Sequence, residues 1–382
     1  MIYLLVREFL PWLEANGLGF LRVFNFVIFQ TTAATLVSFL TVLLTGERVI
    51  RWLRLQKIGD GATFDQAQMD ELMKSKKGTP TMGGVLIIGA IALSTLLLAD
   101  LSNFYVKMAL ICLVWLGGVG AVDDWLKLTA GRRAGSRDGL TTLEKLLFQV
   151  GLAALLGFFT YHWGSAVPAT HTFYVPFLKP EYFSLELSAT VFIVLTILVI
   201  TGASNAVNLT DGLDGLASGT MAITSFAFLV LALIIGDVVL SRTLLYHHIS
   251  AADQMAVLAG AMMGACLGFL WFNCNPARVF MGDTGSLALG GLIGYIAIVI
   301  RQELMLFIIG GIFVAEAVSV LIQIGYFKYT RKRFGEGRRV FLMAPLHHHF
   351  QRKGWAETQV VVRFWLIGAM LAAMAIATIK LR

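Results

Sequence analysis

Long apolar runs alternate with short polar segments along the whole chain. About ten of these runs are long enough to cross the ~30 Å hydrocarbon core of a bilayer as helices. They predict membrane-spanning helices over residues 20–44, 82–100, 105–122, 143–161, 187–204, 216–236, 254–272, 285–300, 304–326 and 360–379. The first dozen residues, which include Trp12, predict an interfacial helix instead of a full span.

The length and continuity of these runs indicate the fold class. Strands of a membrane β-barrel form short segments of alternating hydrophobicity, whereas these runs are continuous. The chain shows no internal repeat and no linker rich in Pro or Ser. We therefore expect an all-α polytopic integral membrane protein, with residues 1–382 forming one domain. Thr172 to Val175, in the loop 162–184, predict a small hairpin.

Composition excludes several classes of protein. Hydrophobic residues make up 57% of the chain and charged residues 14%, and the mean hydropathy is +0.77. Soluble domains carry roughly 25% charged residues, so an ordinary cytosolic enzyme, a disordered chain and a DNA-binding module are excluded. Three cysteines without framework spacing argue against disulfides and a Cys-based metal site. Glu8 and Glu14 argue against a removable signal peptide.

The basic residues are distributed unevenly between the two sets of loops. The net charge is +7, and 22 of the 30 Lys and Arg residues fall in the loops that follow the odd-numbered spans. Cytoplasmic loops of membrane proteins carry such an excess. We therefore expect five cytoplasmic loops and both termini outside, and we do not interpret the positive charge as a nucleic-acid signal.

The first two cytoplasmic loops contain charged residues in unusual places. Lys77 precedes Pro80 at the start of the second span, where a lysine meets a phosphate or simply anchors the helix at the membrane surface. Asp123 and Asp124 end the third span, where they oppose the helix dipole and repel each other. An ion pair between Asp123 and Lys127 leaves Asp124 unexplained. Paired carboxylates suit a divalent cation or a general base.

The third and fourth loops contain amides and carboxylates. Polar residues at every third position in the third loop predict a broken or 3₁₀ turn that binds a ligand or metal: Asn205, Asn208, Asp211 and Asp214. In the fourth loop, Asp283 either caps the next helix, as Thr284 also could, or supplies a hard oxygen ligand to Mg²⁺. Phe280 either stacks on a base ring or packs against the protein.

Three consecutive histidines mark the fifth loop. His347, His348 and His349 suit either a zinc site, although consecutive residues do not easily face one ion, or contacts to phosphate. Glu316 stands alone within the ninth span, and the sequence gives it no role.

Together these clusters favour phosphoryl transfer. Carboxylates, lysines and histidines on one membrane face suit a polyanionic substrate and Mg²⁺, because this chemistry needs positioning and charge neutralisation. The sequence contains no P-loop and no kinase-like Gly-rich loop. A charged site on a membrane scaffold implies one water-soluble reactant and one lipid-borne reactant.

The motifs resemble those of a known family. Lys77 to Gly84, Val122 to Lys127, Asn205 to Ala217, Gly268 to Gly291 and Met343 to Trp355 occur in the family's order. The chain resembles the phospho-N-acetylmuramoyl-pentapeptide transferases, within the polyprenyl-phosphate N-acetylhexosamine-1-phosphate transferase superfamily. The superfamily shares the aspartates, whereas the Pro345 to His349 run and Lys353-Gly354-Trp355 resemble this branch.

The resemblance implies an activity and a cellular setting. It implies transfer of phospho-MurNAc-pentapeptide from UDP-MurNAc-pentapeptide to undecaprenyl phosphate, which yields lipid I and UMP for peptidoglycan synthesis. It also implies Mg²⁺, ten spans in the lipid bilayer of the bacterial inner membrane, extracytoplasmic termini and a homodimer.

The resemblance also implies residue roles. Asp283 resembles the Mg²⁺ ligand, and Asp123 resembles the base or nucleophile with Asp124 beside it. His347 joins these three as a catalytic residue. The nucleotide and diphosphate pocket would comprise Lys77, Asn208, Asp211, Asp214, Asn273, Phe280, His347, His348 and His349. Lys127 and Lys145 would add further contacts to the substrate.

One departure and several alternatives accompany this interpretation. Residues 59–75 lack the short Asp-Gly-Pro pattern of the family, which leaves the conformation of the first cytoplasmic loop open. A sister transferase that moves GlcNAc-1-phosphate is the nearest alternative, and the His347 loop argues against it. A secondary transporter would need polar groups near the bilayer midplane, usually in repeated halves. A purely structural membrane protein would not explain polar clusters gathered on one face.

Overall fold

The computed structural model describes residues 1–56, 78–130, 139–164, 168–178 and 183–380. The helices are α1 (Ile2–Ala15), α2 (Val27–Leu55), α4 (Gly84–Leu98), α5 (Phe104–Ala130), α6 (Thr142–Gly164), α7 (Ala189–Thr210), α8 (Leu216–Gly236), α9 (Val238–Thr243), α10 (Gln254–Asn273), α11 (Gly282–Val299), α12 (Glu303–Ile309), α13 (Gly311–Phe334), α14 (Leu346–Arg352) and α15 (Glu357–Ala377). Short 3₁₀ helices cover Gly19–Asn25, Pro168–Thr170 and Thr378–Lys380. The loop 59–75 lies outside the described residues.

The all-α polytopic architecture predicted from the apolar runs is confirmed. Within the described ranges, nine helices have the length and hydropathy needed to cross a membrane, and α4 is a shorter apolar helix of 15 residues. The predicted hairpin also forms, because β1 (Thr172–Tyr174) pairs antiparallel with β2 (Ser184–Glu186).

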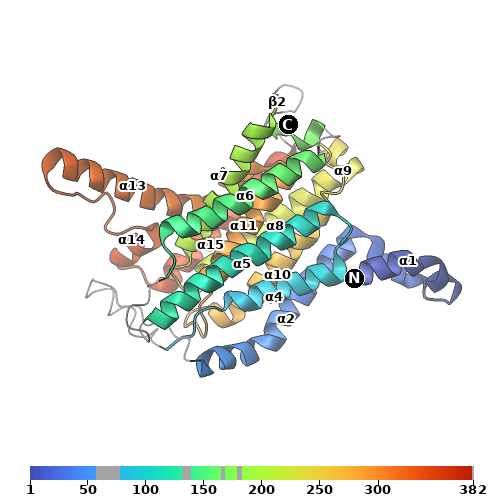
Figure 1. Cartoon of the computed structure of the whole chain (residues 1–382), viewed down its shortest axis with the longest axis horizontal. Helices are drawn as coiled ribbons and strands as arrows, with labels where there is room; N and C mark the ends of the chain where they lie inside the picture. Colours follow the sequence, from blue (N-terminus) through green and yellow to red (C-terminus); the bar gives the residue numbers. More distant parts are fainter. Residues whose placement is uncertain (57–77, 131–138, 165–167, 179–182, 381–382) are drawn as a thin grey trace.

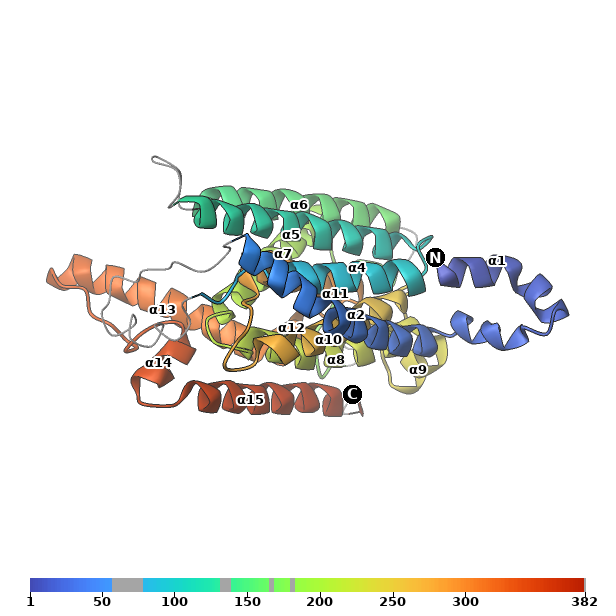
Figure 2. The same ribbon diagram turned by 90° about the horizontal axis from the view of Figure 1, so that it is seen from below.

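The bundle is organised around α11. This helix packs against α5 and α7, while α10 packs between α2 and α8, and α15 covers α8 (Figures 1 and 2). Every side chain of α11 from Thr284 to Val299 is buried. A helix that is apolar all round fits such a central position.

Both chain ends lie at one end of the bundle. Figure 2 shows the start of α1 and the end of α15 at the same end, opposite the end where α5 finishes and α6 begins. An even number of crossings requires this arrangement. The helix α1 extends away from the bundle and exposes Leu5, Phe9 and Trp12, which fits the short helix expected there.

Two predicted spans are wrong in their internal structure. The first span was expected over 20–44, but residues 19–25 form a 3₁₀ helix and α2 continues to Leu55. Hydropathy cannot locate the C-terminal end of α2, because the helix continues through the charged residues Glu47, Arg48 and Arg51. The ninth span was expected over 304–326 as one helix, but Gly310 separates α12 from α13. Adjacent glycines, Gly310 and Gly311, are a frequent cause of such breaks.

The helices that carry the polar motifs also run past their predicted ends. The α5 helix continues to Ala130, so Asp123 and Asp124 lie inside its last turns. The α7 helix continues to Thr210 and includes Asn205 and Asn208. The broken turn expected for this motif is therefore wrong at the two asparagines. It forms only beyond them, and Gly215 adopts a φ of +81° just before α8.

Candidate active site

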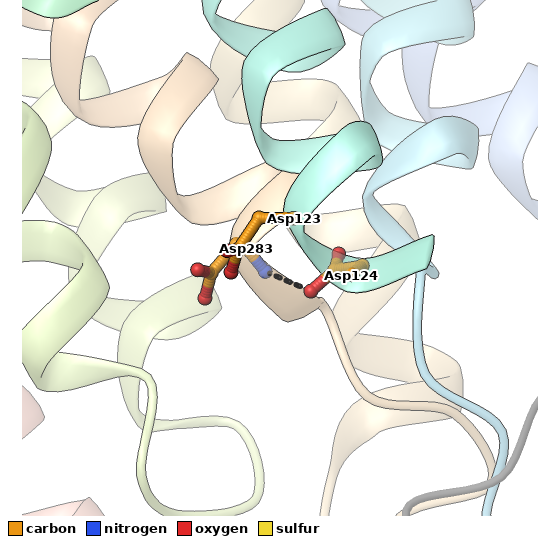
Figure 3. Close-up of side chains that lie close together, drawn as sticks. All are labelled: Asp123, Asp124 and Asp283. Atoms are coloured by element: carbon orange, nitrogen blue, oxygen red, sulfur yellow. Dashed lines mark hydrogen bonds between the residues drawn. The ribbon is translucent and has the colours of Figure 1, made fainter. Parts of the chain in front are cut away.

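Two helices bring three aspartates together. Asp123 and Asp124 come from the end of α5 and Asp283 from the first turn of α11, and each offers a carboxylate oxygen within 4.8 Å of the others (Figure 3). Asp123 and Asp124 are buried, whereas the Asp283 side chain keeps 14% of its surface exposed. Three hard oxygen donors at this spacing could hold a divalent cation.

A glycine allows the two helices to approach this closely. A Cβ atom placed on Gly120 of α5 would lie 2.2 Å from the carbonyl oxygen of Asp283. No side chain fits at that distance, so α5 can cross the start of α11 only where it carries glycine. Gly120 thereby helps set the separation of the three carboxylates.

Two lysines bridge the carboxylates of the two helices. Lys145 Nζ lies 2.6 Å from Asp123 Oδ2 and 2.7 Å from Asp283 Oδ2. Lys127 Nζ lies 2.7 Å and 3.1 Å from the same two oxygens. The ion pair between Asp123 and Lys127 considered from sequence therefore forms, but it is one edge of a four-residue cluster. The remaining oxygen of Asp123 accepts a hydrogen bond from the Leu140 backbone N–H at 2.7 Å.

Asp124 has a different role from its neighbour. Its Oδ1 accepts from the backbone N–H of Asp283 at 3.0 Å, and its Oδ2 accepts from the N–H and hydroxyl of Thr284 at 2.9 and 2.6 Å. Figure 3 shows the first of these bonds, with Asp124 turned towards the start of α11. A carboxylate at this position satisfies free N–H groups and complements the helix dipole. Asp124 thus caps α11 from another helix and fixes Asp283 in place.

The end of α7 adds an amide, and the turn that follows it adds a carboxylic acid. Asn208 Nδ2 donates to Asp283 Oδ1 at 2.8 Å and lies 2.9 Å from Ser286 Oγ. Asp211 keeps part of its surface exposed. Burial, followed by the charges of Asp283 and Asp124, raises the pKa of Asp211 to about 7. Asp211 therefore changes charge near neutral pH.

Two other residues predicted for the pocket form hydrogen bonds that connect one loop to another. Asn273 is buried; its Oδ1 accepts from Gly215 N–H and the Ser218 hydroxyl, and its Nδ2 donates to the Val279 carbonyl. Asp214 is also buried, and its Oδ2 accepts from Asn275 Nδ2 at 3.1 Å and from Ala277 N–H at 3.0 Å. These contacts tie the turn before α8 to the loop between α10 and α11.

Phe280 is half-buried, and its backbone N–H donates to the Pro80 carbonyl at 2.8 Å, which ties its loop to the start of α4. Lys77 lies outside the described residues.

The three histidines face different partners. His347 is buried against Glu316 of α13, His348 Nδ1 lies 2.9 Å from Gln351 Oε1, and His349 Nδ1 accepts from Leu342 N–H at 3.1 Å. Partial burial, and then the charge of Lys353, lower the pKa of His349. The structure therefore does not gather these rings around one point.

Several residues of this site were not singled out from the sequence. Thr284 was considered only as a cap, and Ser286, Leu140 and Gly120 were not considered. Their contacts join segments far apart in the chain, such as Asp124 and Thr284, which are separated by 160 positions. The glycine-rich stretch of α5, Gly117 to Gly120, was the one available signal of close helix packing.

Comparison with known proteins identifies the family. Residues 106–301, about half of the chain, match the model described as Glycosyl transferase family 4. Residues 76–88 match the Phospho-N-acetylmuramoyl-pentapeptide-transferase signature 1. A curated Phospho-N-acetylmuramoyl-pentapeptide-transferase from Desulfotalea psychrophila (strain LSv54 / DSM 12343) is 45% identical over 362 residues, which cover 94% of this chain and 96% of the relative. The chain belongs to the phospho-N-acetylmuramoyl-pentapeptide transferase family.

Membership of this transferase family confirms the resemblance inferred from the motifs and makes the chain a phosphoglycosyl transferase. The matched range 106–301 contains Asp123, Asp124 and Asp283 together with both bridging lysines. The histidine loop lies beyond that range.

The close packing at Gly120 gives a first prediction for this transferase. Gly120→Ala places a methyl group against the start of α11, so we expect it to destabilise the protein by about 1–3 kcal/mol. Transferase activity should fall as the aspartates separate. Gly118→Ala is the matched control, because a Cβ there meets nothing within 4 Å. Thermal unfolding of both variants would measure the difference, and an equal Tm for the two would contradict the packing argument.

Proposed function

We propose that the protein transfers phospho-MurNAc-pentapeptide from UDP-MurNAc-pentapeptide to undecaprenyl phosphate and produces lipid I and UMP. The observation that carries the proposal is the cluster of Asp123, Asp283, Lys127 and Lys145 at one end of a membrane bundle. The name of the 45% identical relative supports the sugar and the peptide.

An apolar groove beside the cluster supports a lipid reactant. The groove has a volume of about 180 Å³ and is lined by α7, α11, α12 and α13, with Ile293, Phe307 and Phe313 among its residues. Its lining reaches Val207, and the next residue, Asn208, donates to Asp283. A prenyl chain in this groove would bring its phosphate to the charged cluster.

The proposed reaction exchanges one phosphoanhydride bond for another. An oxygen of undecaprenyl phosphate attacks the β-phosphorus of the UDP-sugar, and the bond from that phosphorus to the bridging oxygen breaks. UMP leaves with the bridging oxygen. Lys127 and Lys145 would neutralise charge on the phosphates. Asp123 would either deprotonate the lipid phosphate as a base, or attack the β-phosphorus first as a nucleophile and release UMP, in which case the lipid phosphate would then displace the Asp123 carboxylate.

The donor set suits Mg²⁺. Hard carboxylate oxygens are the ligands that this ion prefers, and Asp283 and Asp123 offer them, whereas the oxygens of Asp124 are engaged by α11. We propose that Asp283, assisted by Asp123, holds the cation. A bound cation would supply charge neutralisation at the diphosphate.

The proposal includes an orientation and an assembly. The cluster lies at the end of the bundle that carries the Lys- and Arg-rich loops, which supports a cytoplasmic site in the inner membrane and extracytoplasmic termini. The family resemblance supports a homodimer.

One assay tests the proposal directly. Purified protein is incubated with Mg²⁺, undecaprenyl phosphate and either UDP-MurNAc-pentapeptide or UDP-GlcNAc, and UMP is measured. We expect UMP only with the muramoyl substrate. Release with UDP-GlcNAc alone would favour the sister transferase, and no release with either would overturn the proposed function.

The pKa of Asp211 predicts how cation use depends on pH. Because its pKa is raised to about 7, Asp211 is mostly neutral at pH 6 and mostly charged at pH 8. An added negative charge near Asp283 should lower the Mg²⁺ concentration for half-maximal UMP release by about three- to tenfold over this range. The change should be smaller in Asp211→Asn and unaltered in Glu186→Gln, an exposed control on β2. An identical change in Asp211→Asn and wild type would exclude Asp211 as its source.

A further inference from the structure

The buried carboxylate of Glu316 meets the histidine loop. Glu316 lies near the start of α13 with its side chain fully buried, and α14 packs beside that helix (Figure 1). Its Oε1 accepts from the backbone N–H of His347 at 3.2 Å, and its Oε2 lies 3.2 Å from Nδ1 of the same residue. One carboxylate therefore holds both the backbone and the ring of His347.

The other edge of the imidazole faces the turn between α7 and α8. A Cβ atom placed on Gly212 would lie 2.3 Å from His347 Nε2 and 2.9 Å from Cε1. Gly212 directly follows Asp211 and belongs to the turn that carries Asp214. Nε2 is buried, and within the described residues it has no hydrogen-bond partner. A buried nitrogen without a partner at this turn is placed to meet a bound ligand.

The environment of Glu316 points to an orienting role. Burying a carboxylate is costly unless it is paired, and the ion pair that the described part of the chain provides for Glu316 is the one with His347. His347 Nδ1 and Glu316 Oε2 lie at ion-pair distance, but their geometry is not that of a well-aligned hydrogen bond. Such bonds are often loose without substrate and tighten when it binds.

We propose that Glu316 is a positioning residue that holds the proton of His347 on Nδ1 and so presents Nε2 to the substrate at the Asp211–Asp214 turn. A carboxylate on one nitrogen fixes the tautomer and the ring orientation, which leaves the other nitrogen for the ligand. This inference rests on the proposed function for the identity of the substrate. It assigns a role to a residue that the sequence alone left unexplained.

The test combines a spectroscopic readout with kinetics. Full-length protein with ¹⁵N-labelled histidine is measured by NMR, and His347 is assigned by its absence in His347→Gln. We expect a protonated Nδ1 in the wild type and a mixture of tautomers in Glu316→Gln. The backbone N–H and the ring contact different oxygens of Glu316, and in glutamine one of these oxygens is replaced by an NH₂ group, which donates and does not accept. Turnover should fall by about 10- to 100-fold, while the KM for the UDP-sugar stays close to the wild-type value.

Two further variants separate positioning from packing. Glu316→Asp keeps both acceptor oxygens and should recover about tenfold of the lost turnover. Ser319→Ala removes a hydroxyl that donates to the Glu316 carbonyl at 2.7 Å in the same helix, and it should behave like wild type. Equal losses in Glu316→Gln, Glu316→Asp and Ser319→Ala would overturn the positioning role in favour of packing.

A variant on the opposite side of the ring tests the same geometry independently. Gly212→Ala would displace the imidazole from its place at the turn, so the His347 signal should move and turnover should fall even if Glu316→Gln fails to fold. An unchanged His347 signal in Glu316→Gln or in Gly212→Ala would overturn the proposal. Failure of the wild type to release UMP would instead overturn the proposed function, because the tautomer is measured without substrate.

Discussion

Asp283→Ala is expected to abolish UMP release, with a loss of at least about 10³-fold, or ~4 kcal/mol of transition-state stabilisation. Asp283 is the partly exposed carboxylate of the three, and it contacts Lys127 and Lys145 through one oxygen and Asn208 through the other. Its loss would remove the proposed cation ligand and leave both lysines paired with Asp123 alone. Chelation of Mg²⁺ from the wild type by EDTA should have the same effect.

The control for Asp283→Ala must remove a carboxylate from the same face without touching the cluster. Glu336→Gln does this, because Glu336 is exposed just beyond the end of α13. Its activity should match the wild type. Initial rates at saturating concentrations of both substrates and Mg²⁺ give the comparison, and full UMP release by Asp283→Ala would exclude the metal assignment.

Asp123→Asn is expected to lower turnover by about 10²- to 10⁴-fold, with little change in binding of the UDP-substrate. The asparagine can still accept from Leu140 N–H, but it cannot take up a proton or act as a nucleophile. Its amide group also contributes no charge to the two lysines. Rates measured from pH 6 to pH 9, together with the affinity for the UDP-substrate, separate chemistry from binding.

Two comparisons guard the interpretation of Asp123→Asn. Glu47→Gln, an exposed change in the pair between Glu47 and Arg278, should keep the wild-type rate and pH profile. If Asp123→Asn affects only the reaction and not the fold, the variant should have the elution volume of the wild type in size-exclusion chromatography and the same Tm. Turnover close to wild type at every pH would exclude Asp123 as base or nucleophile.

Hydropathy predicted the helices well, since long apolar runs admit few structures in a bilayer. It failed where helix ends do not coincide with membrane boundaries. The α5 helix carries Asp123 and Lys127 beyond the apolar run, and α2 continues through Arg48 and Arg51. The break at Gly310 was also not predicted, because the run is apolar immediately before and after the glycine pair.

The site was predicted as a set of residues and not as a set of contacts. Unusual polar residues near membrane helices marked Asp123, Asp124 and Asp283. Their division of labour depends on tertiary structure, since Asp124 caps α11 while Asp123 pairs with lysines. Likewise, Glu316 had no partner in its own segment, and only packing of α14 on α13 brings His347 to it.

The two lysines between Asp123 and Asp283 affect how ligands enter the site. Each of the two ammonium groups forms ion pairs with both Asp123 and Asp283. A cation arriving alone would meet two positive charges, and a diphosphate arriving alone would meet two negative ones. When both arrive together, the cation would pair with the carboxylates of Asp123 and Asp283, and the diphosphate would pair with Lys127 and Lys145. If both bind here as proposed, their binding would be thermodynamically linked, and each would raise the affinity for the other by the same factor. With both ligands bound as proposed, such a cluster would discriminate against free ions and against nucleotides that reach the membrane without their metal.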